Sequence, residues 1–172
     1  MYHLVPATLA DIPELLLLIN SAYRGDASRE GWTTEADLLE GSIRTDTEHL
    51  TGLMGRPDAV ILKAQAEEDG ALAGCVFLEK HDRRLYLGML SVSPKRQGGG
   101  IGKRLLQGAE AYAREKGCAT IYMQVISVRQ EIIAWYERHG YRLTGARKPF
   151  DAPLKFGVPT QPLEFVILEK TI

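Results

Sequence analysis

The sequence predicts an α/β fold of the α+β kind, with one mixed central sheet flanked by helices. Strand-like and helix-like runs follow the order β-α-α-β-β-β-α-β-α-β-β, which is not the regular alternation of a doubly wound fold. The pair Asp69-Gly70 lies between two strand-like runs and predicts a hairpin. A glycine-rich loop at residues 98–102 separates a strand-like run from an amphipathic helix, as expected where a sheet strand leads into a covering helix.

The N-terminal segment predicts a strand at residues 3–8, followed by a helix at residues 8–24. Thr8 or Asp11 can cap this helix, and Pro13 is tolerated because it lies near the helix start. The apolar positions of the helix are almost continuous, so we expect it to be buried on more than one side.

The next segment, residues 25–46, predicts a polar loop that leads into a short helix capped by Thr33 or Thr34. A further helical turn is expected at residues 47–55. The later elements are strands at 59–68, 71–81 and 85–94, a helix at 101–117, a strand at 119–126, a helix at 129–140, a strand at 141–147, a loop at 148–162 and a strand at 163–170.

The composition is that of an ordinary soluble globular protein. The 172 residues are 45% hydrophobic and 25% charged, and they predict a single domain over residues 1–172. The net charge of −1 gives no field that would attract nucleic acid or an anionic membrane. The longest apolar run, Leu15–Ile19, is far shorter than the roughly 20 residues that span a bilayer.

The N-terminus has no basic start or apolar stretch of the kind found in secretion signals, so we expect a cytoplasmic protein. Cys75 and Cys118 lack metal-ligand or redox spacing, and their apolar surroundings predict buried free thiols. We therefore expect no metal site, no nucleic-acid partner and no membrane partner. A monomer and a homodimer are both compatible with the sequence.

The glycine loop predicts a phosphate site, because the first amides of a helix lack partners within the helix and the helix dipole favours an anion there. A Walker loop would require Ser or Thr after Gly102-Lys103, where Arg104 stands. A dinucleotide fingerprint would require Gly where Leu105 stands. These departures count against a nucleotide-binding protein.

A third pattern, Q/R-x-x-G-x-G/A, is met in full by residues 97–102. With the preceding run MLSVSP, this stretch resembles the acyl-CoA-binding signature of the GNAT superfamily of N-acetyltransferases. A second stretch, RQEIIAWYERHGY, is similar to the family pattern N-x-x-A-x-x-x-Y-x-x-x-G-F in its downstream half. It departs at Arg129, where the family usually has Asn, and at Ile132, where it has Ala.

The resemblance implies a mostly antiparallel sheet of about seven strands and acetyl-CoA as cosubstrate. The cofactor-binding residues that it implies are Leu90, Val92, Gln97, Gly98, Gly99, Gly100, Ile101, Gly102, Lys103, Arg129 and Tyr136. Of these, Leu90 would polarise the thioester carbonyl through its backbone amide, where the strand separates from its neighbour, and Val92 would pair with the pantetheine arm. Tyr136 would be the general acid, because a phenol can protonate a thiolate of similar basicity.

The general base is less clearly indicated. Some relatives carry a glutamate in the strand before the glycine loop, but the matching position here is Tyr86. Glu35, Glu131 and His81 remain candidates, each also explained by a structural or solvated charge, and water is a further alternative.

The acceptor is expected between residues 23–35 and 148–159, since family members usually bind it against the first helices and a late loop. The first segment carries Arg24, Arg29, Glu30, Trp32 and Glu35, and the second carries Phe150, Asp151 and Phe156. Acids beside aromatic groups suit a cationic amine with an apolar body, although these residues also suit plain loop anchors.

The expected function is therefore transfer of the acetyl group of acetyl-CoA directly to a primary amine. The acceptor is a small molecule, an amino acid or a peptide. The alternative is an acyl-CoA-binding sensor or regulatory module without transferase activity, for which the departures at Arg129 and Tyr86 leave room.

Overall fold

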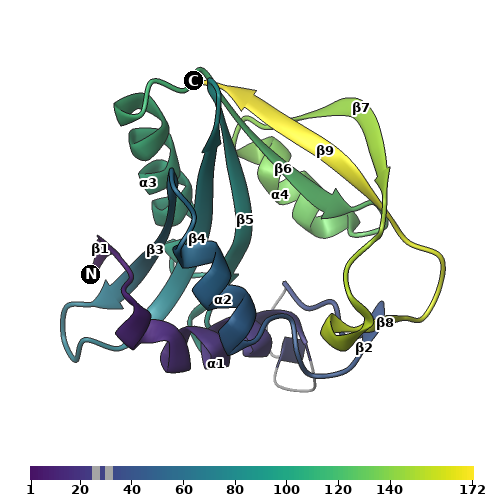
Figure 1. Ribbon diagram of the computed structural model, residues 1–172, viewed down its shortest axis with the longest axis horizontal. Coiled ribbons are helices and arrows are strands. Elements are labelled where there is room, and N and C mark those ends of the chain that lie inside the picture. The colour runs from purple at the N-terminus through teal and green to yellow at the C-terminus, as the bar shows by residue number, and fades with distance from the viewer. Residues whose placement is uncertain (25–27, 30–32) are drawn as a thin grey trace.

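A seven-stranded sheet forms the centre of this computed structural model, which describes residues 1–24, 28–29 and 33–172 (Figure 1). The strands lie in the order β1-β3-β4-β5-β6-β9-β7. Their bounds are β1 Tyr2–Pro6, β3 Ala59–Ala66, β4 Leu72–His81, β5 Arg84–Val92, β6 Thr120–Ile126, β7 Arg142–Pro149 and β9 Glu164–Thr171. Only the β5–β6 pair is parallel. The predicted mixed, mostly antiparallel sheet of about seven strands is confirmed.

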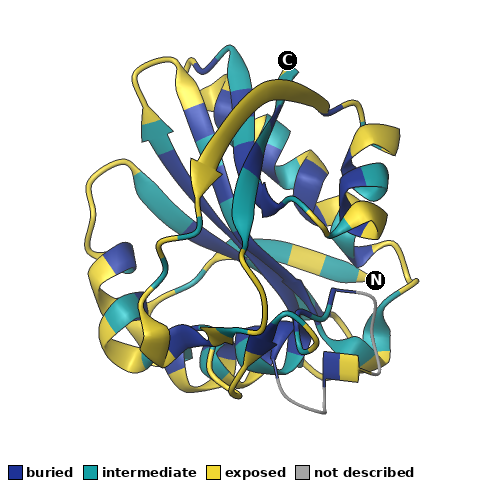
Figure 2. Cartoon of the chain, turned by 90° about the vertical axis from the view of Figure 1, so that its right-hand side faces the viewer, coloured by how far each residue is buried: buried dark blue, intermediate teal, exposed yellow. Residues whose placement is uncertain are grey.

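Helices cover both faces of the sheet. One core joins α1 (Ile12–Tyr23) and α2 (Thr47–Met54) to one face, and a second core joins α3 (Ile101–Glu115) and α4 (Gln130–Arg138) to the other. Strand β4 contributes to both cores, since Phe77 lies in the first and Val76 and Leu78 lie in the second. This double burial explains the continuous apolar run in β4, which shows as a dark blue centre in Figure 2.

The helix expected at residues 8–24 begins as a short 3-10 turn, Leu9–Asp11, before α1. The backbone amide of Thr8 donates to the Asp11 carboxylate at 2.8 Å, and Lys63 on β3 forms an ion pair with the same carboxylate at 2.8 Å. The prediction that this helix is buried on more than one side was wrong, because Leu15 and Ile19 are fully buried but Leu17 is 76% exposed. The helix therefore packs through one broad face.

The short helix expected after Thr33 or Thr34 is wrong as well. Residues 35–39 form turns that lead into β2 (Leu39–Glu40), which pairs with β8 (Val158–Pro159) in a small second sheet. The Thr33 hydroxyl caps no helix and instead donates to the carbonyl of Ala22 at 2.9 Å. The expected turn at 47–55 is confirmed by α2, and the loop at 148–162 contains β8 and a 3-10 turn at Leu154–Phe156.

The parallel strands β5 and β6 pair over a short length only. Their register joins Arg84–Tyr86 to Thr120–Tyr122, after which β5 continues beside β4 and β6 continues beside β9. The two strands diverge beyond Tyr86, and Figure 1 shows the gap widening toward α1. We call this divergence the fork; it is the feature that positions the site.

Candidate active site

The glycine loop follows β5 and leads directly into α3. Gly98 and Gly100 adopt φ of 90° and 82°, a left-handed conformation that disfavours other residues, and Gly100 is the N-cap of α3. A Cβ built on either glycine would meet nothing within 4 Å. The loop before α3 is therefore uncrowded, and the N-terminus of a helix at such a place could hold the diphosphate of an acyl-CoA.

A groove of about 460 Å³ runs along this loop between the start of α3 and one side of α4. We call it the glycine-loop groove. Its walls include Val92, Gly98, Gly100, Gly102, Lys103 and Trp135. A Cβ at Gly102 would lie 3.0 Å from the Trp135 ring, so this glycine lets α3 approach α4 closely. The groove brings together the backbone and the positive charge that the sequence predicts for cofactor binding.

Two of the predicted cofactor residues have side chains engaged elsewhere. The Gln97 amide donates to the Val92 carbonyl and to the Thr33 hydroxyl, both at 3.0 Å, and so ties the glycine loop to β5 and to residue 33. Arg129 lines the cavity at the fork, described below, and not the glycine-loop groove. Its guanidinium donates to the Thr33 carbonyl at 2.6 Å and pairs with Glu35 at 3.2 Å. The Arg129 side chain is thus committed to residues 33 and 35 and does not line the glycine-loop groove.

Leu90 lies in a bulge of β5 at the fork. The β4–β5 register passes from Gly88 to Ser91 without pairing Met89 or Leu90, and Met89 has a positive φ of 49°. The hydroxyl of Tyr23, at the end of α1, donates to the Leu90 carbonyl. Burial raises the pKa of Tyr23 to about 12, so this hydroxyl keeps its proton and remains a donor. The bulge is therefore held in place by the end of α1.

Tyr136 projects from α4 into the same region and is only 4% exposed. Its ring packs against Tyr141 with centroids 5.7 Å apart. Burial raises the pKa of Tyr136 well above its ordinary value of 10, with a smaller contribution of the same sign from Tyr23. The phenol therefore carries its proton throughout the physiological range.

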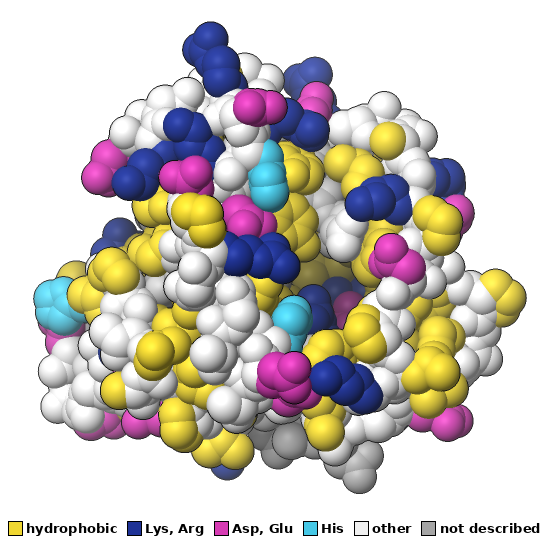
Figure 3. All heavy atoms as spheres, in the orientation of Figure 1, with side chains coloured by type: hydrophobic (Ala, Val, Ile, Leu, Met, Phe, Trp, Pro, Cys, Tyr) yellow, Lys and Arg dark blue, Asp and Glu magenta, His cyan; other side chains and the backbone are white. Residues whose placement is uncertain are grey.

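A cavity of about 450 Å³ opens beside Leu90 and Tyr136, and we call it the fork cavity. Its walls come from the end of α1, residues 35 and 44, helices α2 and α4, strands β4, β5, β6 and β9, and the loop 150–156. Figure 3 shows it as a hollow between the two halves of the molecule, with apolar walls and basic groups inside. The expected acceptor residues Phe150, Asp151 and Phe156 all line it.

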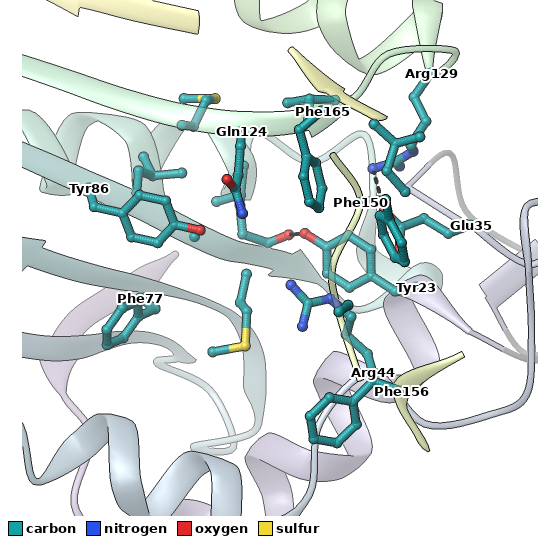
Figure 4. Close-up of a pocket in the computed structure, with 18 of the residues that line it drawn as sticks. Tyr23, Glu35, Arg44, Phe77, Tyr86, Gln124, Arg129, Phe150, Phe156 and Phe165 are labelled. Carbon is teal, nitrogen blue, oxygen red and sulfur yellow. Dashed lines mark hydrogen bonds and ion pairs between the residues drawn. The ribbon is translucent and has the colours of Figure 1, made fainter. Parts of the chain in front are cut away.

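Glu35 also lines the fork cavity, but its carboxylate is held between two arginines. Arg24 lies at 3.1 Å from one oxygen and Arg129 at 3.2 Å from the other, and all three side chains are at least nine-tenths buried. Figure 4 shows the Glu35–Arg129 pair at the edge of the cavity. This arrangement suits positioning of the surrounding segments better than proton abstraction.

The other candidates lie outside the fork cavity. Glu131 is exposed and lines the glycine-loop groove, while His81 pairs with Glu79 near the far end of β4. Arg29 pairs with Asp37 at the surface. Glu30 and Trp32 lie outside the described residues.

Sequence reasoning missed several residues of the cavity, including Arg44, Phe77, Glu79, Gln124 and Phe165. They come from separate segments, and no local motif connects them. Only the two-residue period of β4, β6 and β9, which turns alternate side chains to one face, offered a signal for some of them.

Both cysteines are free and buried, as expected. Within residues 1–24, 28–29 and 33–172, no group of three or more His, Cys, Asp or Glu side chains is arranged to hold a metal. Over the same residues, no helix has the length and apolarity required to cross a membrane.

Comparison with known proteins connects this site to a family. Residues 17–141 match the acetyltransferase (GNAT) family. Streptothricin acetyltransferase from Streptomyces lavendulae is 34% identical over 79 residues, which are 45% of this chain and 42% of that protein. The match thus spans less than half the length of this relative.

Solved structures share the fold over nearly the whole chain. The ribosomal-protein-S18-alanine N-acetyltransferase from Escherichia coli aligns with a TM-score of 0.73 at 16% identity, over 100% of this chain and 94% of that one. The PaiA N-acetyltransferase from Thermoplasma acidophilum, solved in complex with coenzyme A, aligns with a TM-score of 0.71 at 20% identity, over 100% and 99% of the two chains. With a family match over most of its length and this shared architecture, the chain belongs to the acetyltransferase (GNAT) family.

Proposed function

We propose that this protein transfers the acetyl group of acetyl-CoA directly to a primary amine, with Tyr136 as the general acid. The observation that carries the proposal is the meeting of two cavities on β5. Leu90 lines the fork cavity, and Val92, two residues further along, lines the glycine-loop groove. A cosubstrate in the groove and an acceptor in the fork cavity would therefore meet at the bulge.

The glycine loop would hold the diphosphate through the first amides of α3, with Lys103 beside them. When bound, acetyl-CoA supplies a thioester as the acetyl donor. Gly98 and Gly100 leave the approach open, since no atom lies where their side chains would be. The similar structure from Thermoplasma acidophilum was solved in complex with coenzyme A, which supports a coenzyme A thioester as the cosubstrate.

The amide of Leu90 would donate to the acetyl carbonyl oxygen as negative charge develops on it. Tyr23 fixes the other side of this peptide segment by donating to the Leu90 carbonyl. Because both Tyr23 and the bulge are buried, the donor would be oriented before the acceptor arrives.

Tyr136 would supply the proton that the leaving sulfur takes up. The amine nitrogen forms the new C–N bond, the C–S bond breaks, and the sulfur accepts the Tyr136 proton, while the proton of the amine passes to water. Burial keeps the phenol protonated before the reaction, and water returns its proton afterwards. Glu35 would act as a positioning residue that links Arg24 and Arg129.

Release of CoA from acetyl-CoA, measured with and without a panel of amines, tests the transfer. We expect amine-dependent release and a Tyr136→Phe variant with turnover at least about tenfold lower and nearly unchanged acetyl-CoA affinity. Tyr112→Phe is the matched control, because Tyr112 lies on α3 outside both cavities. Saturable acetyl-CoA binding without amine-dependent release would support the sensor instead. Unchanged turnover of Tyr136→Phe at every pH would exclude Tyr136 as the acid.

A further inference from the structure

We propose that the acceptor is a free α-amino acid with an apolar side chain, and that Arg44 binds its carboxylate. The inference rests on the proposed function, because it names the substrate class of the same site. It is carried by the polar and apolar groups of the fork cavity that have no partner within the protein.

Arg44 is the cation of the fork cavity that is left without an anion. Arg24 and Arg129 pair with Glu35, and Arg56 pairs with Glu79 at 3.1 Å. Within the described part of the chain, the Arg44 guanidinium forms no ion pair or hydrogen bond, although it lies 5.7 Å from the Tyr23 ring. The backbone amide of Arg44 donates to the Asn20 side chain at 2.6 Å, which anchors the residue to α1.

Two neutral donors line the same cavity. Tyr86 and Gln124 are half-buried, and no described residue hydrogen-bonds the Tyr86 hydroxyl or the Gln124 side-chain amide. Figure 4 shows both groups and the Arg44 guanidinium directed toward the middle of the cavity, where Tyr23 also points. Burial raises the pKa of Tyr86 and the charge of Arg44 opposes this rise, so the two groups lie within electrostatic range. A carboxylate can accept from all three donors.

The local charge also calls for an anion. Arg24 and Arg129 share the single carboxylate of Glu35, and Arg44 adds a third positive charge to the cavity wall; positive charge that is withdrawn from water without a counter-ion is costly. Arg24 is 4% exposed, and its Nε and Nη1 atoms have no hydrogen-bond partner among the described residues. Asp151, the other unpaired charge of the cavity, is exposed at its rim, where solvent weakens its field. The interior is therefore suited to an anion more than to a second cation.

Aromatic groups form the remaining walls. Phe150 packs against Phe165 with ring centroids 5.2 Å apart, and Phe77 packs edge-on against Tyr86 at 6.2 Å. A cavity of about 450 Å³ with such walls accommodates an apolar side chain beside the polar groups. A charged side chain packed against these rings would lose hydration there.

Tyr23 connects the anion site to the reacting position. Its ring faces Arg44, and its hydroxyl binds the carbonyl of Leu90 in the bulge. Tyr23 thus lies between the two places, with the Arg44 guanidinium 5.7 Å from its ring centroid and its hydroxyl on the bulge. An α-amino acid carries its amine and its carboxylate on one carbon, so a carboxylate held at Arg44 would direct the amine along Tyr23 toward the bulge.

The test compares L-phenylalanine with L-phenylalaninamide and phenethylamine, which keep the amine and the ring but lack the carboxylate. We expect kcat/KM for L-phenylalanine to exceed both by at least about 30-fold, the value of one charge-assisted hydrogen bond. The amine of L-phenylalaninamide is less basic than that of L-phenylalanine, so a larger fraction of it is unprotonated and able to react. Amine basicity alone would therefore favour the amide and not the free amino acid. L-Leucine should be accepted and L-aspartate rejected.

Arg44→Gln should lower kcat/KM for L-phenylalanine by at least about 30-fold, mainly through KM, and change that for phenethylamine by less than about threefold. Arg44→Lys should recover part of the loss in kcat/KM, because lysine keeps the positive charge but cannot donate two parallel hydrogen bonds to a carboxylate. Arg142→Gln is the control, since Arg142 lies exposed on β7 away from both cavities. Equal losses for both amines in Arg44→Gln would overturn the assignment of Arg44.

Calorimetry with the reaction products gives a readout that needs no turnover. The protein should bind N-acetyl-L-phenylalanine more tightly than N-phenethylacetamide, and Arg44→Gln should remove the difference. If amines release CoA without any preference for a carboxylate, the substrate class is wrong and the transferase proposal stands. If the carboxylate product binds through Arg44 but no amine releases CoA, the binding site stands and the transfer is refuted.

Discussion

Replacing Gly100 by Glu tests the glycine loop by placing a carboxylate at the N-cap of α3. The position has room for a side chain, because a built Cβ meets nothing within 4 Å, so no packing is disturbed. Its φ of 82° costs any L-residue about 1–2 kcal/mol of folding stability. Gly100→Ala carries the same backbone cost and no charge, and the difference between the two variants therefore isolates the charge.

The magnitude follows from Coulomb's law. Two unit charges 4 Å apart repel by about 1 kcal/mol in water and by about 4 kcal/mol at the effective dielectric of a protein surface. The groove is partly open, and the diphosphate would present two charges. We therefore expect Gly100→Glu to bind acetyl-CoA more weakly than Gly100→Ala by about 2–4 kcal/mol, which is about 30- to 1,000-fold in Kd.

Isothermal titration calorimetry of both variants at low salt and at about 1 M salt measures this difference. The difference in acetyl-CoA affinity between the two variants should become smaller at high salt, where the Debye length falls to about 3 Å. Urea unfolding of both proteins checks that they fold equally well. Equal affinities of the two folded variants at low salt would refute the diphosphate position, because a carboxylate at the N-cap would then face no phosphate.

Two further predictions concern stability. Gly74→Ala should lower the free energy of unfolding by about 1–3 kcal/mol in urea, because the added Cβ would lie 2.9 Å from the Ser91 carbonyl oxygen. The control Gly52→Ala, in α2 with open space around it, should be neutral or stabilising, and similar results for both variants would contradict the packing argument. Burial alone would raise the pKa of Asp11, but its hydrogen bonds with Lys63 and Thr8 prevail and lower it, so its contribution is complete above the unfolded pKa of about 3.9 and is lost as pH falls through the folded value. Asp11→Asn should therefore be less stable than wild type at pH 7 and approach wild type in thermal unfolding as the pH falls below about 3.9. A stability difference that does not depend on pH would contradict this linkage.

Local patterns predicted most of the fold. The run in β4 and the Asp69-Gly70 turn are encoded by adjacent residues, and so is the stop of α3 before Gly117. The prediction of a helix after Thr33 was wrong because residues distant in the sequence determine the conformation there. Its hydroxyl binds Ala22 and Gln97, and its carbonyl accepts from Arg129. The small β2–β8 sheet was missed because two-residue strands have no periodicity to read.

The lining of the two cavities could be predicted from the sequence to different extents, for the same reason. The glycine-loop groove is built mainly from one continuous stretch, and the sequence predicted its lining from Gly98 to Lys103. The fork cavity gathers side chains from segments more than 100 residues apart, such as Arg44 and Phe165. Their proximity depends on the strand order of the sheet, which single-sequence patterns do not specify. The direction of Arg129 toward Glu35 depended on the same packing.

Three residue pairs are all that join β5 to β6, and hence the four-stranded part of the sheet to the three-stranded part. Beyond Tyr86 the facing edges of these strands run on without pairing to each other. Because so few residue pairs connect them, the two parts of the sheet can move relative to each other. A bound extended molecule with its own amide groups could pair with both free strand edges and restrict this motion. The sheet would then be more rigid when the molecule is bound than when it is released, in each catalytic cycle.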